Sequence, residues 1–162
     1  MLNGKEMIER GIITGPIEEE NISQHGIDLN LTKVERLIHV GTIPRKGKTH
    51  LPEYIEVKPI DGVWQLKPGV YNIVFAQGCN VPSDQMLLIR QRSSLLRCGG
   101  SLHSSVFDAG FSTEFLGSVM VLHHPIDIEV GSRIAQIYNH ECTRVEKLYD
   151  GQFQRDQQRI IP

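Results

Sequence analysis

Two adjacent serines flanked by arginines form the densest group of polar side chains in the sequence. They lie in the segment 90–100 (RQRSSLLRCGG), which follows an apolar run. We predict that Ser93 or Ser94 caps a short helix that ends at Gly99. Hydroxyls, backbone N–H groups at a helix N-terminus and nearby guanidinium groups are suited to binding phosphate oxygens, although a plain helix cap beside solvated arginines has the same pattern. The candidate phosphate ligands are Arg92, Ser93, Ser94 and Arg97.

The second candidate is a carboxylate that stands between apolar residues in the segment 106–111 (VFDAGF). An ionised carboxylate near neutral pH accepts a proton from a water held within hydrogen-bond distance, so Asp108 is a candidate general base. Asp close to Gly is also common in turns, and the alternative is that Asp108 only shapes a turn with Gly110. The residue types alone leave both interpretations open.

The sequence contains no pattern typical of a catalytic metal held by the protein. Its seven histidines form neither HExxH nor a cluster with zinc spacing, and Cys79, Cys98 and Cys142 are widely spaced with no CxxC. The HxE and PCxxC pattern of zinc deaminases is absent, as are GxSxG and the Gly-rich nucleotide loops. An odd number of isolated cysteines indicates reduced thiols, and we therefore expect a cytoplasmic protein.

Composition favours one ordinary globular domain over residues 1–162. With 40% hydrophobic residues, 22% charged residues and a formal net charge of -2, the chain lacks the positive field that nonspecific nucleic-acid binding requires. No apolar run approaches the roughly 20 residues that span a bilayer, and the first residues lack the apolar centre of a signal peptide. We therefore expect neither a nucleic-acid partner nor a membrane partner.

The elements that must position the candidate groups are predicted to be mostly strands. Asn3 is suited to cap a short amphipathic helix whose apolar face includes Met7 and Ile12. After it, apolar and polar residues alternate over residues 27–31 (IDLNL), and a second strand-like run covers residues 34–40. Many short apolar runs separated by Gly, Pro and Asp turns are typical of an all-β sandwich, jelly roll or barrel.

Two further segments have distinctive turn or tail chemistry. Residues 67–69 (KPG) predict a type II turn, because Pro sets the first central φ and Gly permits a positive second one. Residues 149–162 are polar and rich in Gln and Arg. We predict that they form a mobile tail that orders only on a ligand or a neighbouring subunit and closes over the site.

In chain order, several of these segments resemble motifs of the dUTPase and dCTP deaminase superfamily, and deaminase-like, archaeal-type dUTPases are the most similar branch. The resemblance covers most of the chain at modest identity. It implies an all-β distorted jelly roll, or β-clip, with a short N-terminal helix. The segments are residues 22–31 (ISQHGIDLNL), 92–97 (RSSLLR), 108–111 (DAGF), 131–137 (GSRIAQI) and 149–154 (YDGQFQ).

The resemblance also implies roles for individual residues. The four candidate phosphate ligands are expected to bind a nucleoside triphosphate, and Asp28 to organise the metal on it indirectly, through water. Asp108 is expected to hold the 3′-hydroxyl and to activate the attacking water. The expected sugar and base contacts are Phe111, Val121, Gln136, Tyr149 and Gln154.

The activity implied by the resemblance is hydrolysis of dUTP to dUMP and pyrophosphate, with Mg²⁺ on the triphosphate. Members of the family are homotrimers with sites between subunits, so a homotrimer is expected here. One alternative is a dCTP deaminase, or a bifunctional enzyme that acts on both dCTP and dUTP. The other is a noncatalytic nucleotide-binding homologue that signals through a partner.

Three departures from the family pattern bear on this choice. Leu122 stands where deaminases of the family use a Glu, and Leu cannot carry a proton between water and the leaving amine. Residues 112–116 separate Phe111 from Gly117 where the family usually has one residue, which makes Phe115 an alternative aromatic for the sugar and adds Glu114, whose role is unassigned. The Gly-rich arm of trimeric dUTPases is absent, so closure must come from the Tyr149 segment.

Overall fold

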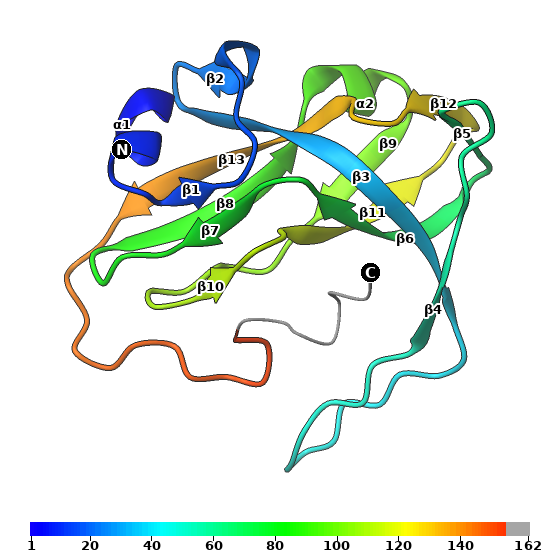
Figure 1. Cartoon of the computed structure of the whole chain (residues 1–162). Helices are drawn as coiled ribbons and strands as arrows, with labels where there is room; N and C mark the ends of the chain where they lie inside the picture. Colours follow the sequence, from blue (N-terminus) through cyan, green and yellow to red (C-terminus); the bar gives the residue numbers. More distant parts are fainter. Residues whose placement is uncertain (155–162) are drawn as a thin grey trace.

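Strands make up most of the protein in the computed structural model, which describes residues 1–154 (Figure 1). The helices are α1 (Gly4–Glu9), the 3-10 helix η1 (Glu19–Asn21) and α2 (Ser93–Arg97). The strands are β1 (Ile13–Thr14), β2 (Ile22–Ser23), β3 (Gly26–Ile38), β4 (Glu53–Glu56), β5 (Val63–Leu66), β6 (Gly69–Phe75), β7 (Gly78–Asn80), β8 (Gln85–Gln91), β9 (Gly100–His103), β10 (Ser112–Thr113), β11 (Gly117–Leu122), β12 (Ile126–Glu129) and β13 (Arg133–Glu141). The prediction of an all-β fold with a short N-terminal helix is confirmed.

The main sheet curls on itself into a nearly closed barrel. Its strand order is β8-β13-β3-β6-β11-β9, and β2 and β4 pair with β3. The two ends of this path meet because the backbone N–H and C=O of Ile89 both hydrogen-bond the Ser104 hydroxyl, at 3.3 and 3.2 Å. Smaller sheets, β1-β7-β10 and β12-β5, lie on opposite sides of the view in Figure 1. Among the described residues, no helix combines the length and apolar composition that crossing a membrane requires.

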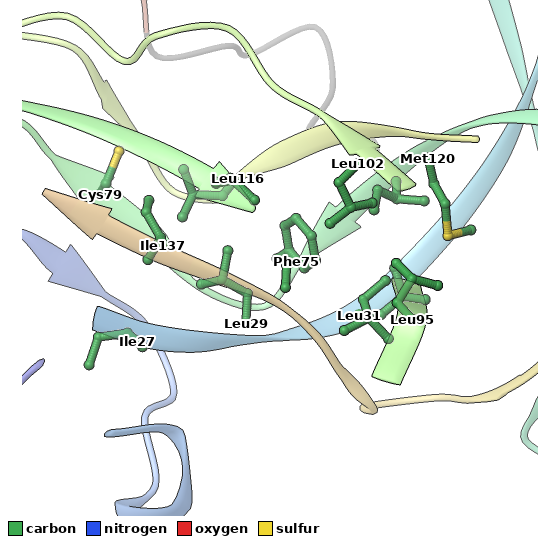
Figure 2. Close-up of a cluster of buried hydrophobic side chains, with 14 of the residues drawn as sticks. Ile27, Leu29, Leu31, Phe75, Cys79, Leu95, Leu102, Leu116, Met120 and Ile137 are labelled. Atoms are coloured by element: carbon green, nitrogen blue, oxygen red, sulfur yellow. The ribbon is translucent and has the colours of Figure 1, made fainter. Parts of the chain in front are cut away.

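Aliphatic side chains fill the interior of the barrel (Figure 2). Ile27, Leu29 and Leu31 of β3 are fully buried and lie near Phe75 of β6 and Ile137 of β13. Burying such side chains supplies about 1.5–3 kcal/mol each, so this cluster dominates the stability of the fold. The predicted alternation over residues 27–31 therefore correctly identified the core face of the strand. The predicted N-terminal helix is also confirmed, since Asn3 caps α1 and Met7 is buried.

Strand β3 is one element of 13 residues where the sequence predicted two separate runs. Its register against β6 shifts between Leu31 and Lys33. Such a bulge adds one residue and moves the side chains that follow it to the opposite face. Val34 is buried for this reason, although it is out of phase with Leu31. The interruption in the apolar pattern thus marks a bulge inside a strand.

One predicted turn and one predicted helix cap are wrong. Gly69 is the first residue of β6, where it pairs with Leu122, and it lacks the positive φ that a type II turn requires. Helix α2 has Arg92 as its N-cap, without a side-chain cap hydrogen bond, so neither Ser93 nor Ser94 caps it. Both serines occupy the first helical turn and are exposed, which leaves their hydroxyls accessible to a ligand.

Gly78 lies in the middle strand of the β1-β7-β10 sheet, and we expect Gly78→Ala to destabilise the protein. An added Cβ would collide with the backbone carbonyl oxygens of Thr113 and Glu114. Because backbone atoms yield less easily than side chains, the free energy of unfolding should fall by about 1–3 kcal/mol. Urea unfolding followed by circular dichroism measures it. Gly69→Ala is the matched control, since its Cβ would meet only ordinary contacts from 3.6 Å, and equal stability of the two variants would contradict the prediction.

Candidate active site

Asp108 lies at a cavity of about 240 Å³ whose walls are largely aromatic. The cavity combines this one carboxylate with hydroxyl groups and apolar surface, which suits a sugar or base ring with a few polar atoms. Its lining residues are Val74, Ser105, Val106, Phe107, Asp108, Phe111, Thr113, Phe115, Gly117, Tyr149 and Phe153.

A short backbone bridge and a turn position Asp108. Phe107 exchanges backbone hydrogen bonds with Leu87 of β8, at 3.0 and 3.1 Å. The chain then turns, and Phe111 N–H donates to the Asp108 carbonyl at 3.0 Å. Among residues 1–154, no side chain or backbone group hydrogen-bonds the Asp108 carboxylate, so its oxygens do not shape the turn. An exposed carboxylate without a partner, on a residue that lines a cavity, is available to accept a proton from water.

Phe111 and Phe115 both line the cavity, so both residues left open by the sequence remain candidates for the sugar contact. The Phe111 ring is held between two others, with its centroid 5.5 Å from that of Phe107 and 5.6 Å from that of Tyr149. The latter pair meets edge to face, which is a favourable aromatic geometry. Phe115 is 39% exposed. Phe111 therefore gives the more rigid wall.

The C-terminal segment 149–154 covers one side of this cavity through Tyr149 and Phe153. Tyr149 N–H donates to the Ala109 carbonyl at 2.8 Å. The Gln154 amide accepts from Ser112 N–H at 3.1 Å and donates to the Gly110 carbonyl at 2.8 Å, so both of its polar atoms bind backbone. Of the predicted tail 149–162, the rest lies outside the described residues.

The segment approaches so closely that position 110 requires glycine. Gly110 has a φ of +90°, a conformation that other residues rarely adopt. An added Cβ would meet the Leu148 Cβ at 2.6 Å. The turn after Asp108 is therefore shaped to receive the C-terminal segment.

Arg92 and Ser94 line a separate, open hollow of about 500 Å³. Of the predicted phosphate ligands, the structure brings these two together there, while Ser93 and Arg97 are exposed on the same helix outside its lining. The hollow shares no lining residue with the Asp108 cavity. The predicted base and the predicted phosphate ligands thus belong to different surfaces of one chain.

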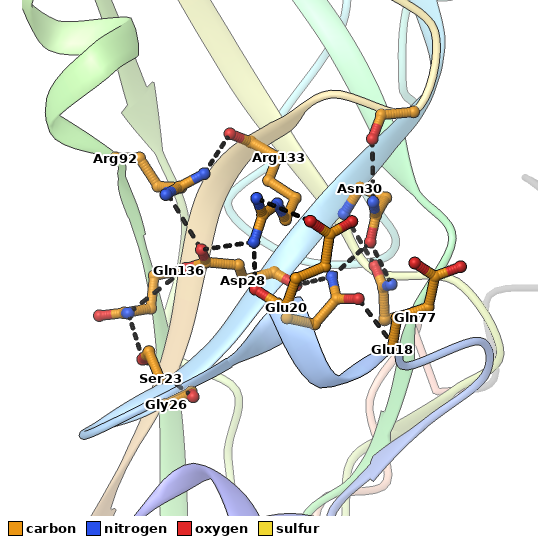
Figure 3. A network of polar contacts seen from close by, with 12 residues as sticks. Glu18, Glu20, Ser23, Gly26, Asp28, Asn30, Gln77, Arg92, Arg133 and Gln136 are labelled. Carbon is orange, nitrogen blue, oxygen red and sulfur yellow. Dashed lines mark hydrogen bonds and ion pairs between the residues drawn. The ribbon is translucent and has the colours of Figure 1, made fainter.

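Asp28 holds Arg92 in position (Figure 3). The Arg92 Nε lies 3.1 Å from Asp28 Oδ2, and Arg92 Nη1 donates to the Arg133 carbonyl at 3.1 Å. Gln136 Nε2 donates to Asp28 Oδ1 at 3.4 Å and to the Ser23 hydroxyl at 2.6 Å. The Asp28 side chain is only 8% exposed. This network fixes a guanidinium group before any anion arrives, which reduces the entropy cost of binding.

Burial raises the pKa of Asp28 above its ordinary value of 3.8, and the opposing effects of Arg92, Gln136 and Arg133 are smaller. A raised folded-state pKa means that the folded protein binds the proton more tightly than the unfolded chain. The contribution of Asp28 to stability is therefore full below its unfolded pKa and is lost as pH rises through the folded pKa.

We expect this loss to appear as a pH-dependent difference between the wild type and Asp28→Asn. As pH rises from below the ordinary pKa of Asp through the weakly acidic range, the wild type should lose unfolding free energy relative to the variant. Urea unfolding of both proteins at a series of pH values measures the difference. A difference that grows in favour of the wild type as pH rises would contradict the assignment.

Arg133 is a residue of this site that the sequence analysis did not single out. It lines the hollow with Arg92, and its Nη2 lies 3.2 Å from Glu20 Oε2. Its Nη1 also donates to the Glu20 carbonyl and lies 4.0 Å from Asp28 Oδ2. The pairing of β13 with β3, Arg133 opposite Asn30, places it near Asp28, and the pairing of β13 with β8 places it near Arg92. The signal available in the sequence was a lone Arg directly after the turn at Gly131.

Three other residues of interest lie outside both hollows. Gln136 supports Asp28, and Val121 lies on β11 opposite Val70 and Ser101. Leu122 is 2% exposed, and its side chain approaches Gly100 inside the core. The position where a deaminase of the resembled family has its Glu is therefore closed to substrate.

Comparisons with known proteins agree with the resemblance stated from the sequence. The family model described as dCTP deaminase-like matches residues 3–142. The deoxyuridine 5′-triphosphate nucleotidohydrolase of Methanocaldococcus jannaschii is 38% identical over 140 residues, which cover 83% of this chain and 88% of that protein. The probable deoxyuridine 5′-triphosphate nucleotidohydrolase of Halobacterium salinarum is 31% identical over 164 residues, covering 93% of this chain and 95% of that protein.

The fold is similar to a crystal structure of 2′-deoxycytidine 5′-triphosphate deaminase from Agrobacterium tumefaciens, with a TM-score of 0.64 and 15% sequence identity. The match covers 85% of this chain and 46% of that one, so the chain spans about half the length of its structural neighbour. This likeness concerns the fold alone.

Proposed function

Because the chain belongs to the dCTP deaminase-like family, we propose that it hydrolyses dUTP to dUMP and pyrophosphate. The observation that carries the proposal is that Asp108 lines an aromatic-walled cavity and that its carboxylate has no hydrogen-bond partner among the described residues. The names of archaeal relatives at 38% and 31% identity support the same substrate. The enzyme would act in the cytoplasm, where its three free thiols stay reduced.

In the proposed reaction Asp108 holds a water in line with the α-phosphorus and accepts its proton. The water oxygen forms a bond to the α-phosphorus while the bond from that phosphorus to the α–β bridging oxygen breaks, and pyrophosphate leaves with the bridging electrons. Positioning of the water and electrostatic stabilisation of the phosphates supply most of the rate. Arg92, Ser93, Ser94 and Arg97 would bind the phosphates.

Phe111 would pack against the deoxyribose, and backbone groups of β11 near Val121 would contact the uracil. A ribose 2′-hydroxyl pressed against the Phe111 ring would lose its hydrogen bonds to water, which would favour deoxynucleotides. Gln136 would act close to the phosphates through Asp28. Tyr149 and Gln154 would close the site, and the backbone contacts of Gln154 support a role in holding the segment in place.

Mg²⁺ would sit on the triphosphate, held mainly by phosphate oxygens and water. Within residues 1–154 no cluster of three or more His, Cys, Asp or Glu side chains is placed to hold a metal. A site with few protein ligands fits Mg²⁺, which commonly keeps several waters and binds through substrate phosphates. Both carboxylate oxygens of Asp28 already have protein partners, so its contact with the metal would run through water. The ion would supply charge neutralisation.

The proposal includes a homotrimer in which the Asp108 cavity of one subunit meets the Arg92 hollow of the next. Separate placement of the two hollows on one chain supports this arrangement. Val70 is an apolar side chain that is 51% exposed, on the same strand as Val74 of the cavity. A second subunit would bury Val70.

The test is to incubate the purified protein with dUTP and, separately, with dCTP, and to follow pyrophosphate and ammonia together. Pyrophosphate from dUTP without ammonia from dCTP supports the proposal, and omission of Mg²⁺ should then abolish the signal. Ammonia from dCTP would overturn it in favour of deamination, which Leu122 in the core does not support. Tight nucleotide binding without either product would indicate a noncatalytic homologue.

A further inference from the structure

Gln152 has no role in the proposed reaction, yet it makes a two-way contact with a distant part of the chain. Its Oε1 accepts from Thr49 N–H at 2.9 Å, and its Nε2 donates to the Thr49 carbonyl at 2.7 Å. The side-chain amide thus pairs with the backbone as a neighbouring strand would. No other described contact of this kind joins the C-terminal segment to residues 39–52.

Thr49 lies in the long loop between β3 and β4, which extends away from the sheets (Figure 1). The loop is stiffened where Thr42 and His50 exchange backbone hydrogen bonds at 2.8 and 2.9 Å. None of its residues lines the Asp108 cavity. The Gln152 contact is a direct link from the loop to the segment that covers the cavity.

The turn at residues 151–154 connects the two. Gln154 N–H donates to the Gly151 carbonyl at 3.1 Å, and Phe153 N–H donates to the Tyr149 hydroxyl at 3.4 Å. Within this compact turn, Gln152 reaches the β3–β4 loop while Phe153 lines the cavity. Fixing Gln152 consequently fixes the aromatic wall formed by Phe153 and Tyr149.

We propose that the contact between Gln152 and Thr49, here called the Gln152 latch, holds the C-terminal segment over the cavity and thereby sets the affinity for the nucleotide. Gln152 is a positioning residue that acts through Tyr149 and Phe153. Exposed segments with few buried contacts open locally at low cost, so loss of two of the hydrogen bonds that join this one to the rest of the chain should favour its opening. For its substrate the inference rests on the proposed function.

Hydrogen exchange tests the latch without any substrate. In Gln152→Ala the Thr49 amide loses its acceptor, so its exchange rate should rise about tenfold, as should exchange across residues 149–154. Gln65→Ala is the matched control, because Gln65 is an exposed residue of β5. Unchanged exchange at Thr49 in Gln152→Ala would overturn the latch, whatever the protein's activity.

Kinetics with dUTP test its consequence. Loss of two hydrogen bonds should raise KM about tenfold, with kcat within about twofold because the backbone bridge and turn that position Asp108 are unchanged. Thr49→Pro removes the Thr49 N–H donor and with it one of the two hydrogen bonds, so it should raise KM by less, and adding it to Gln152→Ala should cause no further loss. Additive effects, or a fall in kcat alone, would overturn the proposal. Absent turnover in the wild type would refute the proposed function and leave the exchange result to decide the latch.

Discussion

Asp108→Asn should lower kcat for dUTP hydrolysis about 1,000-fold, the size expected when a general base is removed. Asn has the same shape and can still accept a hydrogen bond from water, but it cannot take the proton as the bond to the α-phosphorus forms. Because the Asp108 carboxylate has no hydrogen-bond partner among residues 1–154, its replacement breaks no internal contact. Steady-state release of pyrophosphate measures the loss.

The control for this variant is Asp61→Asn. Asp61 is an exposed residue with a φ of +48°, a conformation that Asn also tolerates. Its activity and both variants' thermal unfolding should match the wild type. If Asp108→Asn kept most of its activity, Asp108 would be no more than a ligand of the sugar, and the base would have to be sought elsewhere in the cavity.

Mixing two inactive variants should restore activity if each site takes residues from neighbouring subunits. Asp108→Asn removes the base, and Arg92→Gln removes a phosphate-binding charge. The loss of this charge should reduce activity about 100-fold, while the Gln amide can still donate a hydrogen bond to Asp28. When equal amounts are unfolded and refolded together, about a quarter of the shared sites combine an intact Asp108 with an intact Arg92. We therefore expect about a quarter of wild-type activity to return.

Native mass spectrometry of the refolded mixture establishes that mixed oligomers have formed. A mixture of Asp108→Asn with Asp108→Ala serves as the control and should stay inactive, because no arrangement of these chains restores the base. Mixed oligomers without recovered activity would show that a single chain builds its own site. The homotrimer arrangement proposed here would then be wrong.

Local patterns in the sequence predicted the fold well where the physics is local. The Asn3 cap and the buried alternation at residues 27–31 depend on neighbours along the chain, and both are present. The bulge after Leu31 could not be predicted from the sequence, because a register shift depends on how β3 pairs with β6. The capping role predicted for the serines of α2 was wrong, because Arg92, extended directly after β8, occupies the N-cap position.

The site was predicted in part for the same reason. The type of residue at Asp108 and Arg92 identified candidates for a base and a phosphate ligand, and the structure places each in a hollow. It could not be predicted from spacing that Arg133 approaches Arg92, because the pairing of β13 with β8 brings them together. Gln152 also gave no signal, since its partner is backbone that any residue other than Pro would offer at position 49.

The buried position of Leu122 bears on how catalysts of this fold can change their chemistry. A carboxylate placed there by one substitution would enter an apolar interior beside Leu95 and Gly100 without a partner, at a cost of several kcal/mol. That cost is comparable with the whole stability margin of many domains of this size. An evolutionary route from hydrolysis to amine removal in this chain would therefore need repacking of the interior before the new acid arrived. Intermediate sequences would have a less tightly packed interior before they gained any deaminase activity.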